Sequence, residues 1–520
     1  MTLLVRGEVV TAVESAAALP ARATILSDGT VVVEDGRIVD VGPHKVLRAQ
    51  YPGADELGSA QHLVLPGFVD AHDHARGLGH MQGGVGDEAL ETWLLRLDDC
   101  LDIGPYLAAL WTGLALIESG VTTVMHDVIP PAHGTLADGV LAALRAYDEL
   151  GLRVALGVPF FDQGALSLDE EGFLASLPAQ LRGHAESWAQ ARAGLPMEEY
   201  TATVAELQRI CRQHYPRARL LVSPGGPWRC SDATLVRLTE WARSEGLGRH
   251  LHLLETRYQR ALGVRCYGGR TLVQVLADLD VLGPDLTCAH GVWLTAADIA
   301  LLAEAGVSVV HNPSSNLRLR SGIAPVPAML AAGINVGLGL DGIALNDDQD
   351  FVQEMRLCAS LHAYPGVDAP ALNSAQVLHM ATAGGARAVL GHDTSAQGKA
   401  TCGQIKAGAP ADLILVHQER MRAPYTHPRI ETLDLWLRRG KAEDVESVIV
   451  DGRVVMRTRR LSGVDRREIA GRVAEAAERA LRDAREPPPW RDALLQRLRH
   501  FYQDWVESPV EPYDARNSRV

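Results

Sequence analysis

The chain has 520 residues, a formal net charge of −14 and 47% hydrophobic residues, and its acidic and basic side chains are interspersed. This composition is typical of a globular protein with a large core, arranged as one large domain with satellites or as two to three domains. It argues against nucleic acid or an anionic membrane as a partner, since both need a concentrated basic surface.

The cysteines and the first residues bear on the compartment. The seven cysteines are scattered and contain no C-x-x-C pair, so we expect reduced thiols and not disulfides or zinc thiolates. The start, MTLLVRGEVV, lacks the basic and apolar regions of a signal peptide. No apolar run approaches the ~20 residues that a membrane span requires. We therefore expect a cytoplasmic protein.

Short β-branched runs separated by glycine turns fill residues 1–65, for example 30–34 and 38–41 on either side of the Asp35-Gly36 turn. The same texture returns in 411–416 and 448–455. Alternation broken by D-G turns marks antiparallel strands. We predict one small β-sandwich domain built from both ends of the chain, residues 1–65 and 396–465.

Residues 66–395 alternate short apolar runs with stretches long enough for helices. Eight such units favour a closed parallel (β/α)₈ TIM barrel. An open doubly wound sheet is the alternative, and we disfavour it because no G-x-G-x-x-G follows a predicted strand. The eight runs are VLPGFVDAH, GVTTVMHD, RVALGVPFF, ARLLVSPGG, RHLHLLE, LTCAHGV, VSVVHNP and INVGLGLD.

The tail, residues 466–520, has helical periodicity and is interrupted by Pro487-Pro488-Pro489. We expect it to pack on the barrel or on a partner subunit, and nothing in it indicates chemistry. We also expect a homo-oligomer, a dimer.

Polar side chains fall at the predicted carboxyl ends of the strands, where the active-site groups of a barrel meet. The first strand ends with His72 and His74, which alternation places on one side. Each histidine alone could be a core residue, but the set at separate strand ends makes coincidence an unlikely explanation. Three imidazoles and one carboxylate suit a divalent metal, zinc or iron, with a position left for water. The later candidates are His252, Glu255, His290 and Asp341.

Six motifs carry a resemblance to a known family. The chain contains P-G-F-V-D-A-H-x-H, H-x-x-E-T, A-H-G-V-x-L, H-N-P-x-S-N-L-x-L, G-L-D-G and G-x-I-x-x-G-x-x-A-D-L. This set resembles the amidohydrolase superfamily, and within it the mononuclear branch with cytosine, guanine and adenosine-type deaminases and triazine hydrolases. The resemblance covers nearly the whole chain outside the C-terminal tail.

The resemblance implies roles for the candidates. His72, His74, His252 and Asp341 would hold the metal, and Asp341 would also be the base for the attacking water. Glu255 would carry a proton to the substrate's ring nitrogen and then to the leaving group, and His290 would polarise the substrate.

The distribution of lysine along the chain bears on how many metal ions the site holds. Relatives with two metals use a carboxylated lysine on a middle strand as a bridge, and no lysine occurs between Lys45 and Lys399. We therefore expect one divalent metal, Zn²⁺ or alternatively Fe²⁺.

Five residues are predicted to contact the substrate: Arg76, His126, Trp228, His311 and Arg320. An aromatic side chain beside a metal site stacks on planar substrates. Two arginines at the pocket mouth would favour a carboxylate or a phosphate. The alternatives are that the arginines face solvent and that Trp228 and His311 belong to the core.

The sequence therefore favours hydrolytic deamination of an amino-substituted nitrogen heterocycle. The alternative at the same site is hydrolysis of a cyclic amide, or a triazine-type displacement of chloride or an alkylamine. A non-catalytic assembly protein is disfavoured by the intact ligand set, and a dinucleotide oxidoreductase by the lack of a phosphate-binding glycine loop.

Overall fold

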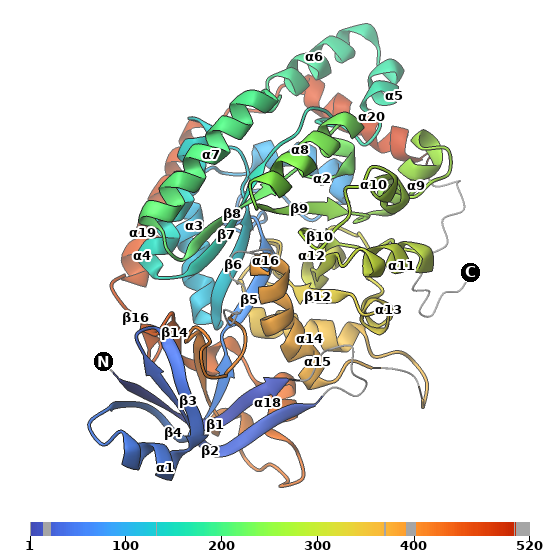
Figure 1. The fold of residues 1–520 in the computed structure, drawn as a ribbon. Helices are drawn as coiled ribbons and strands as arrows, with labels where there is room; N and C mark the ends of the chain where they lie inside the picture. Colours follow the sequence, from blue (N-terminus) through green and yellow to red (C-terminus); the bar gives the residue numbers. More distant parts are fainter. Residues whose placement is uncertain are drawn as a thin grey trace.

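The structure is a computed structural model that describes residues 2–13, 22–131, 133–368, 371–391, 402–503 and 505. It contains an eight-stranded parallel barrel, a separate mixed sheet and two helices near the C-terminal end (Figure 1). The α/β fold class predicted from the sequence is confirmed. Among the described residues, no helix is both long and apolar enough to cross a membrane.

All eight strands predicted for the barrel are present, and each pairs in parallel with the next strand along the chain. Their apolar side chains are buried, as expected for a sheet covered on both faces. The strands are β5 (Phe68–Asp73), β6 (Val121–Asp127), β7 (Arg153–Pro159), β8 (Ala218–Ser223), β9 (Gly248–Leu253), β10 (Leu286–His290), β11 (Ser308–His311) and β12 (Asn335–Leu338).

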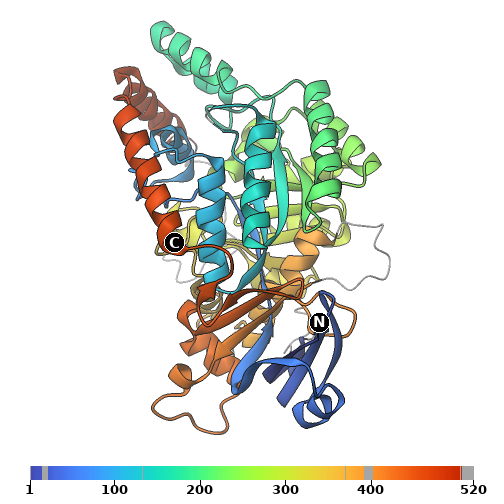
Figure 2. The ribbon, with the colours of Figure 1, turned by 90° about the vertical axis from the view of Figure 1, so that its left-hand side faces the viewer.

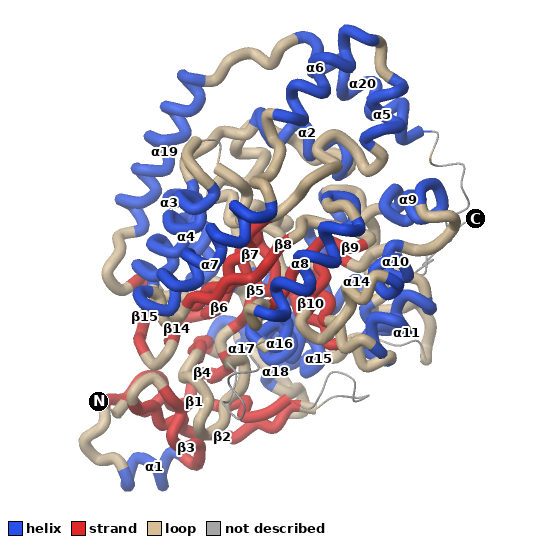
Figure 3. The backbone as a smooth tube through the Cα atoms, turned by 45° about the horizontal axis from the view of Figure 1, so that its top comes forward, coloured by secondary structure: helices blue, strands red, loops and turns tan. Residues whose placement is uncertain are grey.

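Helices follow the strands and surround the barrel (Figure 3). Several begin at a capping box, in which Thr135, Thr271 or Thr295 binds a backbone N–H and fixes the first residue of the helix. The helices are α2 (Leu90–Arg96), η1 (Leu97–Asp99), α3 (Pro105–Glu118), α4 (Leu136–Leu150), α5 (Glu170–Ser176), α6 (Ala179–Gln190), α7 (Met197–His214), η2 (Pro227–Arg229), α8 (Asp232–Ser244), α9 (Arg257–Cys266), α10 (Leu272–Asp278), α11 (Ala296–Glu304), α12 (Pro313–Arg318), α13 (Val326–Ala331), α14 (Phe351–Leu361), α15 (Ser374–His379), η3 (Met380–Gly384) and α16 (Gly385–Leu390).

The barrel is closed by contacts between β5 and the segment that follows β12. The backbone N–H of Asp341 donates to the carbonyl of His72 at 2.8 Å. The N–H of Leu340 donates to Oδ1 of the buried Asp70 at 3.1 Å. The chains approach so closely here that a Cβ at Gly339 would lie 2.9 Å from the backbone N of His72. Only glycine fits this position without displacing the backbone.

Both ends of the chain build the mixed sheet, whose eight strands are joined in the order β16-β15-β14-β13-β4-β1-β2-β3. The strands form one continuous sheet, parallel between β1 and β4 and antiparallel elsewhere. The predicted boundary between residues 395 and 396 lies outside the described residues. The elements are β1 (Leu3–Val13), β2 (Ala23–Glu34), β3 (Arg37–Pro43), α1 (His44–Gln50), β4 (Asp55–Pro66), β13 (Leu413–His417), α17 (Glu419–Arg422), α18 (Thr432–Arg439), η5 (Ala442–Asp444), β14 (Val445–Val450), β15 (Arg453–Arg457) and β16 (Arg460–Leu461).

The C-terminal helices α19 (Arg466–Asp483) and α20 (Pro489–Gln503) lie against helices of the barrel (Figure 2). Arg466 of α19 pairs with Glu118 of α3 at 3.1 Å. At the start of α20, Arg491 binds Asp99 and the carbonyl of Leu95, both at 2.6 Å. The predicted helical tail thus packs on the barrel, although residue 504 and residues 506–520 lie outside the described part of the chain.

A buried ion pair joins the barrel to the mixed sheet. Arg153 at the start of β7 binds Asp412 just before β13, with N···O distances of 3.2 and 3.3 Å. The Asp412 side chain is fully buried and also accepts the N–H of Asp451 at 2.7 Å. Removing the arginine would leave a buried carboxylate without its counter-charge.

We predict that Arg153→Met lowers the free energy of unfolding by about 3–5 kcal/mol, because breaking one side of a buried pair is strongly destabilising. Urea denaturation followed by circular dichroism measures the change. Arg209→Met is the matched control, since it removes an exposed pair with Glu206 and should cost at most about 1 kcal/mol. Equal losses in the two variants would contradict the prediction.

Candidate metal centre

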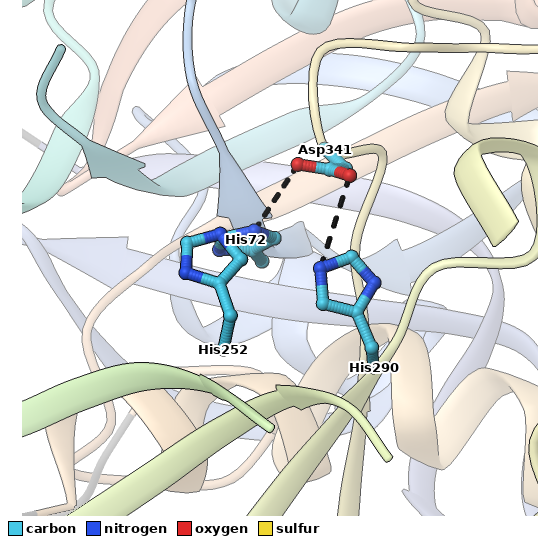
Figure 4. A group of neighbouring side chains, drawn as sticks. All are labelled: His72, His252, His290 and Asp341. Atoms are coloured by element: carbon cyan, nitrogen blue, oxygen red, sulfur yellow. Dashed lines mark ion pairs between the residues drawn. The ribbon is translucent and has the colours of Figure 1, made fainter. Parts of the chain in front are cut away.

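Imidazoles from three barrel strands gather around one carboxylate at the C-terminal mouth of the barrel (Figure 4). Nε2 of His72 lies 3.1 Å and Nε2 of His74 lies 3.2 Å from Oδ1 of Asp341. Nε2 of His290 lies 3.9 Å from Oδ2 of the same carboxylate. Nε2 of His252 lies 3.3 Å from Nε2 of His74. The structure therefore brings together the residues that the sequence placed on four separate strands.

The outer nitrogen of each imidazole is held by a hydrogen bond. Nδ1–H of His74 donates to the carbonyl of Asp127 at 2.9 Å, and Nδ1–H of His252 donates to the carbonyl of Gly225 at 2.6 Å. Nδ1 of His72 is hydrogen-bonded to Nε2 of His250 at 2.9 Å. A proton fixed on Nδ1 leaves the lone pair of Nε2 directed into the site, which is the arrangement of a metal-binding imidazole.

Asp341 is positioned by its backbone as much as by its side chain. It has a φ of 59°, and His290 has a φ of 75°, so both strand ends adopt the left-handed conformation that side chains rarely take. The backbone N–H of Asp341 donates to the carbonyl of His72. Its side-chain Oδ2 accepts the hydroxyl of Ser315 at 2.5 Å. Left-handed backbone conformations of non-glycine residues are energetically unfavourable. They persist where surrounding contacts hold them, and they are concentrated at functional sites.

The donor set fits a divalent metal. The buried Nε2 atoms of His72 and His290 make no hydrogen bond to another described residue. Burial lowers the pKa of His72 to about 4 and that of His252 well below its ordinary value, so both rings are neutral donors near pH 7. One atom from each of four residues can be chosen so that all lie within 4.8 Å of one another: His72, His252, His290 and Asp341. Imidazole nitrogens and a carboxylate suit zinc.

Glu255 stands directly beside this group. It follows β9 and Leu254, whose φ is 45°, and its side chain is buried. Its Oε2 lies 3.6 Å from Nε2 of His290, and its Oε1 accepts the hydroxyl of Ser321 at 3.4 Å. Burial first, and then the negative charges of Asp341 and Glu91, raise the pKa of Glu255 well above its usual range. A carboxyl group in this environment can hold a proton at neutral pH.

A cavity of about 900 Å³ opens above the site and reaches from His74 to Trp188. Three of the predicted substrate-binding residues line it: Arg76, His126 and Trp228. His126 is held by the hydroxyl of Tyr147 at 3.2 Å, and burial lowers its pKa to about 3. These three residues therefore belong to the wall of the cavity above the cluster of imidazoles.

The structure does not place the other two predicted residues in this cavity. His311 ends β11, where it is buried and hydrogen-bonded to His362 at 3.1 Å. Arg320 is exposed and lies just beyond α12, whereas Arg318 of α12 is buried and paired with Asp87. The role of Arg320 at the pocket mouth stays a prediction.

Sequence reasoning missed two contributors to the site. His250 alternates with His252 along β9, so the H-x-H pattern was the available signal for a second imidazole on that face. Tyr502 of α20 lines the cavity, and its hydroxyl accepts the N–H of Leu168 at 3.0 Å. The contact could not be predicted from the sequence, because no local pattern around Tyr502 indicates that it packs against a segment more than 300 residues earlier in the chain.

Fold and donor cluster together define a (β/α)₈ barrel protein with a candidate site for a divalent metal at the barrel mouth. Residues 63–455 match the protein-family model described as "Amidohydrolase family". Residues 31–54 match the protein-family model described as "Imidazolonepropionase-like composite domain, bacteria". The chain belongs to the amidohydrolase family, and the family predicted from its motifs is confirmed.

Similar proteins carry deaminase names. The chain is 32% identical over 463 residues to the 5'-deoxyadenosine deaminase of Methanosarcina mazei, covering 87% of this chain and 94% of that protein. It is 32% identical over 461 residues to the 5-methylthioadenosine/S-adenosylhomocysteine deaminase of Desulforudis audaxviator, covering 87% and 95%. The solved structure of an adenosine deaminase from Xanthomonas campestris with bound zinc has a TM-score of 0.74 and 28% identity, covering 92% and 98%.

We predict that His250→Ala weakens zinc binding by about 10–100-fold while the protein stays folded, because the partner that orients the His72 ring is lost. Competition with a zinc-binding dye measures the affinity. His44→Ala is the matched control, since His44 makes one side-chain hydrogen bond, to Thr30 at 3.0 Å, in the mixed sheet. Unchanged affinity in His250→Ala would show that the His250 contact does not orient a ligand.

Proposed function

We propose that this protein is a zinc-dependent deaminase that hydrolyses the exocyclic C–N bond of an aminopurine nucleoside and releases ammonia. The observation that carries the proposal is the pair of carboxyl groups on either side of His290. Nε2 of His290 lies 3.6 Å from Glu255 and 3.9 Å from Asp341. Deamination needs one group that accepts a proton from water and another that donates one to a poor leaving group.

We infer that one metal is held by His72, His74, His252 and Asp341. The convergence of their Nε2 and Oδ1 atoms supports this assignment, as does the zinc in the similar adenosine deaminase structure. The lack of lysine between Lys45 and Lys399 supports a single metal. When bound, a divalent metal lowers the pKa of a water to about 7, so that hydroxide is available at neutral pH.

The side chains then divide the proton transfers. Asp341 is ionised at neutral pH, because His72 and His74 outweigh the effect of burial and hold its pKa below the usual range. Its carboxylate is therefore free to accept the proton of the attacking water. Glu255 donates a proton to the ring nitrogen beside the reacting carbon. As the tetrahedral carbon collapses to the carbonyl, its hydroxyl proton passes through the Glu255 carboxylate to the amino group, which leaves as ammonia. The proton on Asp341 then returns to Glu255, so both side chains regain their starting states. His290 lies between both carboxyl groups and orients the substrate for these transfers.

The cavity supports a purine nucleoside as the substrate class. Its volume of about 900 Å³ lies within the range of about 300–1,000 Å³ that is typical of small-molecule sites. Trp228 and His126 supply ring surfaces on its wall, on which a planar base can pack. The names of the similar proteins point to the adenine nucleosides as the first compounds to test.

We predict that Glu255→Gln lowers kcat for adenosine, 5'-deoxyadenosine or 5-methylthioadenosine by about 10²–10⁴-fold, since the glutamine cannot donate the proton. Ultraviolet absorbance and ammonia release measure turnover, and zinc content should remain at one per chain. Glu8→Gln is the control, because Glu8 lies in the mixed sheet, where it accepts the hydroxyl of Thr432 at 2.9 Å. Its kcat should fall by less than about tenfold.

Two results would count against this proposal. Near-normal turnover of Glu255→Gln would remove Glu255 from the proton path. No ammonia release by the zinc-loaded protein from any of the three nucleosides, and none from adenosine 5'-phosphate or adenosine-5'-carboxylate, would overturn the substrate class.

A further inference from the structure

The arginines that line the cavity above the candidate metal centre differ in whether a carboxylate pairs with them. Three arginines line it: Arg76, Arg192 and Arg229. Arg192 is paired with Asp98, and its guanidinium stacks on Trp188 at 3.8 Å. Neither Arg76 nor Arg229 forms an ion pair with any carboxylate in the part of the chain that the structure describes. The difference between paired and unpaired arginines in one cavity requires an explanation.

Arg76 lies in the loop after β5, two residues beyond His74. Its guanidinium carbon lies 4.9 Å from the ring centre of Trp93, a fully buried side chain. Nε of Arg76 is buried and has no hydrogen-bond partner among the described residues. An aromatic face fixes the plane of the guanidinium but does not neutralise its charge. The terminal nitrogens remain available to a ligand in the cavity.

Arg229 lines the same cavity from another element, the short helix η2 that follows β8. Its Nη1 donates to the carbonyl of Gly164 at 3.0 Å, and its guanidinium lies 5.2 Å from the ring centre of Phe161. Like Arg76, it is therefore held in place by a ring and by neutral groups. Both arginines are half-buried. Removing a cation from water without supplying a counter-charge is costly, so two unpaired arginines in one cavity favour an external anion.

The acidic residues of the cavity wall do not supply that anion. Three carboxyl groups line the cavity: Glu91, Asp98 and Asp102. Glu91 accepts the hydroxyl of Thr256, Asp98 is paired with Arg192, and Asp102 accepts the N–H of Gly104 at 2.7 Å. The chain as a whole carries a formal charge of −14, so the unpaired cations of the cavity stand against the general charge of the protein.

We propose that Arg76 and Arg229 form a binding site for an anionic group of the substrate, a carboxylate or a phosphate. The preferred substrate is then an aminopurine nucleoside that carries such a group, and not a neutral nucleoside. The guanidinium fork matches the paired oxygens of either anion. The proposal rests on the proposed function for the heterocycle, but the anion site itself rests on the charge of the cavity alone.

Two matched pairs of compounds test the proposal by calorimetric titration of the zinc-loaded full chain. Adenosine-5'-carboxylate against its carboxamide reports on a carboxylate, and adenosine 5'-phosphate against adenosine reports on a phosphate. We expect the charged member of at least one pair to bind about tenfold or more tightly than its neutral partner. Arg76→Met and Arg229→Met should each reduce that preference about tenfold.

Arg192→Met is the matched control, because Arg192 lines the same cavity but is already neutralised by Asp98. It should keep the preference of the wild-type chain for the charged compound. Arg76→Lys retains the positive charge and should keep part of the preference for the charged compound. The midpoint of thermal unfolding is recorded for each variant, and if Arg76→Met fails to fold, Arg229→Met and Arg76→Lys decide the outcome.

The outcomes separate this inference from the proposed function, because ammonia release is measured with the same compounds. No preference for a charged compound in the wild-type chain, or equal preference in Arg229→Met and Arg192→Met, overturns the anion site. If the anion site is overturned in this way but neutral nucleosides are still deaminated, the proposed function is supported. Arginine-dependent binding of an anion without ammonia release would support the anion site and overturn the proposed function.

Discussion

The closure of the barrel is the constraint on which the rest of the site depends. The hydrogen bond from Asp341 N–H to His72 O joins the segment after the last strand to the first strand at 2.8 Å. It therefore brings the carboxylate of Asp341 to the imidazoles of His72 and His74 by the same contact that closes the ring. Gly339 permits the approach, and the buried carboxylate of Asp70 binds Leu340 N–H beside it. The fold and the chemistry are coupled here, because neither the first nor the last strand of the barrel can shift without separating the carboxylate of Asp341 from the imidazoles of His72 and His74.

The orientation of the imidazoles depends on a second group of contacts, made largely by backbone carbonyls. Asp127 O and Gly225 O, at the ends of β6 and just after β8, bind the outer nitrogens of His74 and His252. A carbonyl at a strand end is fixed by the sheet, so each ring is oriented without the entropy cost of ordering another flexible side chain. The barrel thus supplies rigid donors and acceptors whatever the sequence of the loops above it.

The sequence was informative where function and local pattern coincide. Eight strands, the residues at their ends and the family could be predicted, because alternation and short motifs determine which side chains face the mouth. The loops and the tail are where local patterns say least. Arg320 follows β11 and is exposed, whereas Arg318, two residues earlier, is buried and paired with Asp87, and no periodicity separates the two. Tyr502 reaches the cavity only through the packing of α20, which no local periodicity encodes.

The same division separates the chemistry from the specificity. The proposed catalytic groups stand on strand ends that the barrel holds rigidly, whereas the cavity wall is built from α2, the segments after β6 and β7, η2 and the C-terminal helix α20. These segments are tied to one another by surface contacts, such as Arg491 with Asp99 and Arg499 with Glu88, and not by the sheet. Changes in them can alter the size and charge of the cavity without moving His72, Glu255 or Asp341. A barrel of this kind can therefore keep one hydrolytic centre and still take substrates of different charge, and the unpaired Arg76 and Arg229 lie outside the strands that hold that centre.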